Sequence, residues 1–172
     1  MSLAEELHQR RPFTSVQEEA LLSVFVTQDI LHHNLQKMLR PHGLSLAQYN
    51  VLRILRGAGE DGLPLMTIAR RMIVRYPNVT RLTDRLETNG WIRRERCTHD
   101  RRIVRGFVTV DGLELLAQIN GEIDHLVVHL MRGVQDERLR ELIAVLEQVR
   151  LPLRSSNGNG EAPTAEEPDE SC

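Results

Sequence analysis

The sequence is poor in aromatic residues and cysteine, and it has no long apolar run. It contains three Phe, two Tyr and one Trp in 172 residues, so a core has to be built mainly from Leu, Ile and Val. The two cysteines, Cys97 and Cys172, have no metal-binding spacing and indicate no disulfide framework. No stretch reaches the roughly 18 apolar residues of a membrane span, and residues 1–13 lack the apolar segment of a signal peptide. We therefore expect a cytoplasmic protein of one domain with short extensions.

Charge is distributed unevenly along the chain. The formal net charge is only -2 at pH 7, yet residues 155–172 contain five acidic residues and no Lys or Arg. Residues 70–105, in contrast, contain eleven Arg and four acidic residues. A basic block in a nearly neutral chain is typical of a nucleic-acid-binding surface, although a solvated arginine-rich face without a ligand has the same composition.

Residues 65–89 have the pattern of a helix-turn-helix. A short helix over 65–72 and a turn at 73–76 lead to a second helix. Pro77 suits the first position of that helix, where its missing N–H costs nothing, and Gly90 suits the left-handed position that closes it.

The segments around this unit predict a helix before it and a β-hairpin after it. Ser45 and Gln48 have the spacing of a capping box, which starts a helix, and 57–64 has the composition of a loop. Residues 91–96 and 103–109 read as two short strands joined by a polar tip. The hairpin would form a wing beside the helix-turn-helix.

The remaining helices favour a dimer. The helix over 17–39 carries apolar residues on two faces, and a monomer of this size buries only one. Two closing helices follow Thr109, which can cap the first of them, and the second is expected to end before Pro152. The fold class is therefore mainly α with a small β-hairpin wing. The expected organisation is a lead-in (1–16), a helical dimerisation region (17–44 and 110–152), a winged helix-turn-helix domain (45–109) and a disordered acidic tail (153–172).

The second helix of the helix-turn-helix is amphipathic in an informative way. Val79, Leu82 and Leu86 lie on one side and are expected to face the core. The opposite side carries amide, hydroxyl and charged groups: Asn78, Thr80, Arg81, Asp84 and Arg85. Such groups pair with base edges and phosphates in a major groove, with Arg suited to guanine and Asn to adenine.

The hairpin tip carries two adjacent arginines, Arg101 and Arg102, whose mutual repulsion is unfavourable without a partner. A phosphate backbone or a narrow minor groove would stabilise them, whereas a salt-bridged turn without a ligand is the alternative. Asp100 would repel phosphate, so we expect it to orient a guanidinium, for example that of Arg94 on the facing strand.

The run VTRLTDRLETNGWIRRERCTHDRR, followed by VTVDG, resembles the winged-helix core of the MarR family of regulators. The resemblance extends over about residues 20–150, and its specific parts are the second helix, the Asp-Arg-Arg tip and the Thr-x-x-Gly at Thr109 and Gly112. Trp91, where a smaller aliphatic residue is usual, and the acidic tail depart from the family pattern.

The resemblance implies a homodimeric regulator that binds double-stranded DNA at a palindromic operator and has no cofactor. It places Asn78, Thr80, Arg81 and Arg85 at the major groove. It places Arg101 and Arg102 at the minor groove, with Asp100 holding the wing arginines. Repression is the better expectation, because a dimer that covers a promoter needs no further contacts.

Regulators of this family often respond to a small aromatic acid or phenol. We hypothesise that Tyr49 and either His32 or His33 line such a pocket, where the dimerisation helices meet the DNA-binding domain. Core packing of Tyr49 and simple exposure of the histidines are the alternatives. A ligand that fits one spacing of the two DNA-binding domains better than another would change operator affinity.

Regulators of other types remain as alternatives. His125 and His129, four apart on one helix, could hold a metal together with His32, His33 or His42, but no thiol or carboxylate pair completes the set, so no metal is expected. Cys97 lies among Arg93, Arg94 and Arg96, which could lower the pKa of an exposed thiol, although an incidental surface residue is the simpler interpretation. No catalytic motif is present, so an enzyme is not expected.

Overall fold

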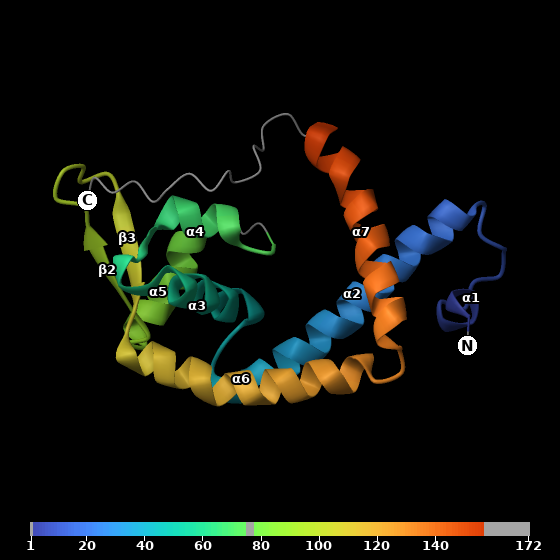
Figure 1. The fold of residues 1–172 in the computed structure, drawn as a ribbon, viewed down its shortest axis with the longest axis horizontal. Coiled ribbons are helices and arrows are strands. Elements are labelled where there is room, and N and C mark those ends of the chain that lie inside the picture. The colour runs from blue at the N-terminus through green and yellow to red at the C-terminus, as the bar shows by residue number, and fades with distance from the viewer. Residues whose placement is uncertain (1, 75–77, 157–172) are drawn as a thin grey trace.

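The computed structural model describes residues 2–74 and 78–156, and it has two parts: a head and a set of long helices (Figure 1). The head, residues 45–109, contains the sheet and the helical elements within that range. The long helices come from both ends of the chain. Helical elements are α1 (Leu3–Glu6), α2 (Val16–Leu39), η1 (Arg40–His42), α3 (Leu46–Ala58), η2 (Gly59–Asp61), α4 (Leu65–Arg71), α5 (Val79–Thr88), α6 (Val110–Met131) and α7 (Asp136–Ser156). The strands are β1 (Leu63–Pro64), β2 (Ile92–Arg96) and β3 (Val104–Val108).

This arrangement confirms a mainly helical fold with a helix-turn-helix and a β-hairpin wing. Two predicted features, the turn at 73–76 and the position of Pro77, fall partly or wholly outside the described residues. The helix that follows begins at Val79, with Asn78 as its N-cap. Within residues 2–74 and 78–156, no helix has the length and apolar character needed to cross a membrane.

The core lies inside the head and where the head meets α2 and α6. As the composition predicts, it consists mostly of aliphatic side chains, with Leu39, Leu52, Leu55, Ile68, Leu86, Leu116 and Ile119 all fully buried. Leu39 comes from α2 and the last two from α6, so the long helices contribute to the same core as α3, α4 and α5. The burial of these side chains fixes the position of the head on the long helices.

The sheet has three antiparallel strands in the order β1-β3-β2, one more than the sequence predicts. The added strand lies in the segment 57–64 that was expected to be a loop, and its Leu63 pairs with Gly106. A two-residue strand ending in proline has no periodicity to detect. Gly62 makes the pairing sterically feasible, because a Cβ there would lie 2.4 Å from the Phe107 ring.

Capping side chains start the helices where the sequence predicts. Ser45 Oγ accepts the N–H of Gln48 (3.2 Å) while Gln48 Oε1 accepts the N–H of Ser45 (2.9 Å), which is the expected capping box. Thr109 Oγ1 accepts the N–H of Gly112 (3.1 Å) and so caps α6. Both caps therefore confirm the predicted helix starts.

The end of α7 differs from the prediction. The helix was expected to stop before Pro152, but it continues through Pro152 to Ser156. A proline inside a helix removes one backbone hydrogen bond and is accommodated by a local bend, and here little helix remains beyond it. The boundary of the predicted tail at 153 is therefore too early, and the rest of that segment lies outside the described residues.

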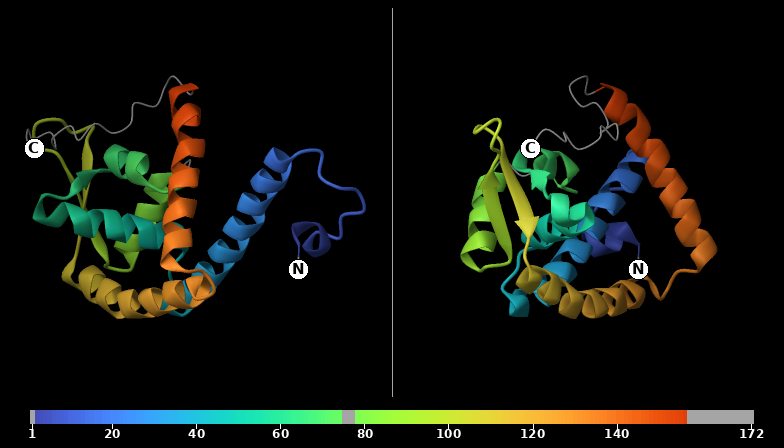
Figure 2. Two further views of the ribbon diagram at one scale, coloured as in Figure 1. Left: turned by 45° about the vertical axis from the view of Figure 1, so that its right-hand side comes forward. Right: turned by 60° about the vertical axis from the view of Figure 1, so that its left-hand side comes forward.

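The helices α2, α6 and α7 expose many apolar side chains in the single chain. On α2, Leu21 is 54% exposed and Phe25 is 58% exposed. None of residues 136–153 of α7 is buried, although Ile143 and Val149 belong to its apolar stripe. The two views of Figure 2 show α7 extending alongside the body of the molecule rather than being enclosed by it.

A close backbone contact joins α5, the wing and α6. The N–H of Trp91 donates to the carbonyl of Leu86 (3.0 Å), and the carbonyl of Trp91 accepts the N–H of Thr109 (3.1 Å). Thr109 Oγ1 also donates to the carbonyl of Gly90 (2.6 Å). A Cβ at Gly112 would lie 2.2 Å from the carbonyl oxygen of Trp91, so glycine is required there.

We predict that Gly112→Ala lowers the free energy of unfolding by about 2–3 kcal/mol, because a methyl group cannot fit without moving the backbone of Trp91. Gly121→Ala in the same helix is the matched control: nothing lies within 4 Å of its added Cβ, and the substitution should raise stability by about 0.5–1 kcal/mol. Denaturant unfolding at one fixed protein concentration measures both. Equal effects of the two substitutions would contradict the assignment of this contact.

Candidate nucleic-acid interface

The two sides of α5 are separated as predicted. Val79 and Leu86 are buried in the core, and Leu82 packs against it. Thr80, Arg81 and Arg85 are exposed on the other side. Thr83, which no sequence pattern singled out, is fully buried and donates from Oγ1 to the carbonyl of Thr80 (2.8 Å). This internal bond lets a hydroxyl occupy a core position.

Asn78 has a structural task at the start of α5. Its Oδ1 accepts the N–H of Arg81 (2.9 Å), which makes it the N-cap. The expected role of Asn78 was to contact a base in the major groove. The structure shows that its oxygen is engaged in the cap, which fixes the direction in which α5 begins.

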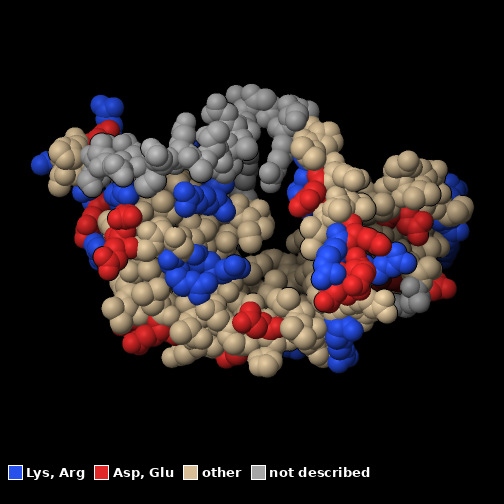
Figure 3. Space-filling view, in the orientation of Figure 1, with Lys and Arg blue, Asp and Glu red and all other residues tan. Residues whose placement is uncertain are grey.

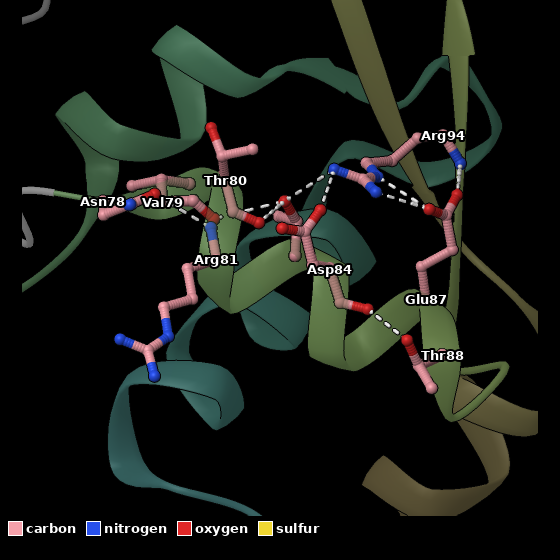
Figure 4. A network of polar contacts seen from close by, with 9 residues as sticks. Asn78, Val79, Thr80, Arg81, Asp84, Glu87, Thr88 and Arg94 are labelled. Carbon is pink, nitrogen blue, oxygen red and sulfur yellow. Dashed lines mark hydrogen bonds and ion pairs between the residues drawn. The ribbon is translucent and has the colours of Figure 1, made fainter.

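Arg94 on β2 is the centre of a polar network with α5 (Figure 4). Its Nη1 lies 2.7 Å from Asp84 Oδ1, and its Nη2 lies 2.6 Å from Glu87 Oε2. Nε also donates to Glu87 Oε2 (2.9 Å), and the backbone N–H of Arg94 donates to Glu87 Oε1 (2.9 Å). The pKa of Arg94 is raised, first by the hydrogen bond with Glu87.

These contacts correct the expected pairing of Asp100 with Arg94. Asp84 and Glu87 on α5 are the partners, because the register of the hairpin places Arg94 in the middle of β2, opposite Gly106, whereas Asp100 lies at the tip. The sequence indicated these partners only weakly, because Asp84 was interpreted only as part of the exposed polar face of α5.

Asp100 stabilises the turn at the tip instead. Its Oδ1 accepts the N–H of Arg102 (2.9 Å), and its carbonyl accepts the N–H of Ile103 (2.9 Å). The side chains of Arg101 and Arg102 are exposed. Asp100 thus holds the backbone that carries the arginines rather than their guanidinium groups.

Cys97 is not a surface residue. It is 5% exposed, and its Sγ lies 3.5 Å from the backbone N of Asp100, which donates to it. The expectation of an incidental surface cysteine is therefore wrong. The same burial is inconsistent with the alternative interpretation, an exposed thiol that lies among arginines.

The arginines of the basic block have different environments. Arg105 is buried and donates from Nη2 to the carbonyls of Asp61 (3.0 Å) and Gly62 (3.4 Å). Arg93 contacts Glu95 and lies over the ring of Phe107, with Cζ 4.0 Å from the ring centroid. Figure 3 shows Lys and Arg side chains at the outer end of the wing and over the head, while both signs of charge mix over α7.

The residues of the hypothesised effector pocket occupy different environments. Tyr49 is 5% exposed, and burial raises the pKa of its hydroxyl, opposed by the nearby charges of Arg53 and Arg56. His32 and His33 are exposed on α2. In the single chain, the structure therefore gives Tyr49 a core environment and leaves both histidines at the surface.

The histidines considered for a metal site do not form one group. His42 Nε2 lies 3.1 Å from Glu122 Oε2, which connects η1 with α6. His129 Nδ1 lies 3.4 Å from Arg132 Nη1, and His125 is exposed on the same helix. Among residues 2–74 and 78–156, no cluster of three or more His, Cys, Asp or Glu side chains could hold a metal ion.

Comparison with known proteins gives one consistent result. The model of the MarR family matches residues 44–104. The HTH-type transcriptional regulator TtmR of Methylorubrum extorquens is 30% identical over 151 residues, covering 88% of this chain and 75% of that protein. A MarR transcription factor from Planctomyces limnophilus has 31% identity and a TM-score of 0.63, over 80% of this chain and 99% of that one. A MarR family transcriptional regulator from Streptomyces coelicolor, solved in complex with DNA, has 23% identity and a TM-score of 0.71, over 85% and 93% of the two chains.

Proposed function

Because the chain belongs to the MarR family of transcriptional regulators, we propose that it is a sequence-specific DNA-binding repressor that acts as a homodimer on a palindromic operator. The solved relative from Streptomyces coelicolor that carries DNA supports DNA as the partner.

The observation that carries the proposal is that one head presents both an exposed polar helix face and an arginine-tipped hairpin. Thr80, Arg81 and Arg85 project from α5, whose other side is fixed in the core. Arg101 and Arg102 project from the wing tip. A helix that enters the major groove and a hairpin that reaches the adjacent minor groove or backbone account for both features. Asn78 and Asp100 serve this surface by fixing the start of α5 and the turn at the tip.

A second copy of this chain is the occupant that we propose for the exposed apolar faces of α2, α6 and α7. A long amphipathic helix such as α7 gains most of its stability from burying its apolar face, which the single chain leaves uncovered. The apolar faces belong to helices from both ends of the chain, outside the head. A two-fold dimer through them leaves both heads free, and they would meet successive major grooves about 34 Å apart.

Repression follows from this geometry, since a dimer that spans two turns of a promoter blocks it without further contacts. The proposed ligand is a small aromatic acid or phenol that binds where the long helices meet the head, near Tyr49 and His32 or His33. Arg53, whose Cζ lies 5.8 Å from the Tyr49 ring centroid, gives that region a positive charge. Such a ligand would release DNA by favouring a different spacing of the heads.

We predict that Arg101→Ala weakens binding to the DNA flanking this gene by about tenfold, the value of one charge-assisted hydrogen bond. The slope of log affinity against log salt concentration should fall by about one, which reports a lost phosphate contact. Mobility shift over a salt series measures both quantities. Arg10→Ala removes an exposed charge remote from the head and should change neither. Absence of binding by the wild-type protein to any such fragment would contradict the proposed function.

We predict that Ile143→Glu weakens dimerisation by at least about a hundredfold, because each dimer would bury two unpaired carboxylates. Ile143 is 55% exposed in the single chain, and Arg140, three residues earlier, is exposed and polar. Arg140→Gln is therefore the control and should remain dimeric. Sedimentation equilibrium gives the dissociation constants, and an unchanged dimer for Ile143→Glu would place the interface elsewhere.

We predict that benzoate, as a simple aromatic acid, gives a calorimetric binding signal that Tyr49→Ala abolishes. Tyr49→Phe keeps the ring and its packing, so it should keep part of the signal. His125→Ala, an exposed change on α6, should keep all of it. A titration that Tyr49→Ala leaves intact would remove Tyr49 from the ligand site.

A further inference from the structure

The face of α5 proposed to meet DNA carries acidic groups that oppose this task. The side chain of Asp84 is 53% exposed and that of Glu87 is 37% exposed, on the helix that also presents Arg81 and Arg85. A carboxylate beside a phosphate backbone is repelled by it, and the repulsion grows when water is excluded. Binding of DNA to this face therefore requires a positively charged group that neutralises these carboxylates where they lie.

The guanidinium of Arg94 is that positively charged group. Its three nitrogens are all engaged: Nε and Nη2 with Glu87 Oε2 (2.9 and 2.6 Å) and Nη1 with Asp84 Oδ1 (2.7 Å). Nη1 also lies 3.5 Å from Oγ1 of the buried Thr83. Only 20% of the Arg94 side chain is exposed, so its donors point into the head (Figure 4). Figure 4 also shows the side chain of Arg81 extending away from this network.

The same contacts set the angle between the wing and α5. Strand β2 lies at the edge of the sheet and follows α5 after the short link 89–91. Glu87 accepts from both the backbone N–H and the side chain of Arg94, so one carboxylate holds the main chain and the guanidinium of the wing at once. Two guanidinium nitrogens donate to one oxygen of Glu87 while the third reaches Asp84. A lysine ammonium could not reproduce this planar set of donors.

We propose that Arg94 is a positioning residue for DNA recognition: it clamps the wing to α5 through Asp84 and Glu87 and cancels charge on the DNA-facing helix, without contacting DNA itself. The inference rests on the proposed function for its role in binding, while the clamp is a property of the free protein. The clamp fixes the spacing of Arg81 and Arg85 relative to Arg101 and Arg102. Less conformational entropy is therefore lost when α5 and the wing dock on DNA together.

The clamp is tested first without DNA, by amide hydrogen exchange of the full-length protein. In Arg94→Gln, peptides that cover 83–96 should exchange at least about fivefold faster, because opening of this junction becomes easier. Arg96→Gln removes the same charge from the same strand at an exposed position and should leave these rates unchanged. Unchanged exchange in Arg94→Gln would overturn the clamp, whatever the protein does with DNA.

The role in recognition is tested by operator affinity in two backgrounds. In the wild type, Arg94→Gln should weaken binding at least about tenfold. In an Asp84→Asn, Glu87→Gln background, whose carboxylates are gone, it should weaken binding less than about threefold. Arg96→Gln should have the same effect in both backgrounds. Equal losses for Arg94→Gln in both would show a direct phosphate contact and overturn the positioning role. If the wild type binds no DNA, the proposed function fails, and the exchange experiment still decides whether the clamp exists.

Discussion

The close approach of Gly112 to the carbonyl of Trp91 is the constraint on which the arrangement of this molecule depends. Three segments meet at that point: the end of α5, the first residue before β2 and the first turn of α6. The bonds from Trp91 to Leu86 and from Thr109 to Trp91 and Gly90 connect the same segments. A change in the direction of α6 therefore acts on α5 and the wing through the backbone of Trp91 and through the hydroxyl of Thr109.

The ring of Trp91 extends this junction to the turn that follows η1. A Cβ at Gly43, in the turn between α2 and α3, would lie 3.7 Å from Trp91 Cη2. A smaller aliphatic residue at position 91 would not reach as far. The large side chain of Trp91, which departs from the family pattern, thus fills the space between the head and the turn that connects α2 with α3.

The arginines show why a basic composition alone does not define a binding surface. Arg105 is buried against backbone carbonyls, Arg94 is paired with two carboxylates, and Arg93 is stacked on Phe107. The exposed Arg81, Arg85, Arg101 and Arg102 remain directed outward from the helix and the tip. The proposed DNA interface therefore uses only part of the basic block, and the paired Arg94 belongs to the proposed clamp between α5 and the wing. Burial and pairing separate the two groups of arginines, and neither is visible in a charge count.

Local chemistry was enough to predict most of the elements and the outer face of α5. Helix caps are favoured by the side chains of Ser45, Gln48 and Thr109, and a left-handed turn is favoured by Gly90 because it has no side chain. The helical period of Val79, Leu82 and Leu86 determines which side of α5 faces inward. The resemblance to the MarR family added the roles of the helix and the tip.

Only the tertiary structure decided which groups meet across segments distant in sequence. It gave Arg94 its partners on α5, made β1 part of the sheet, buried Cys97 and Thr83, and placed Tyr49 in the core. These outcomes depend on the register and the packing of separate elements, so no local pattern contains them. The sequence by itself determined most of the elements and the face that α5 turns outward. The fold decided which groups connect the wing to α5, because those contacts form only after the elements pack.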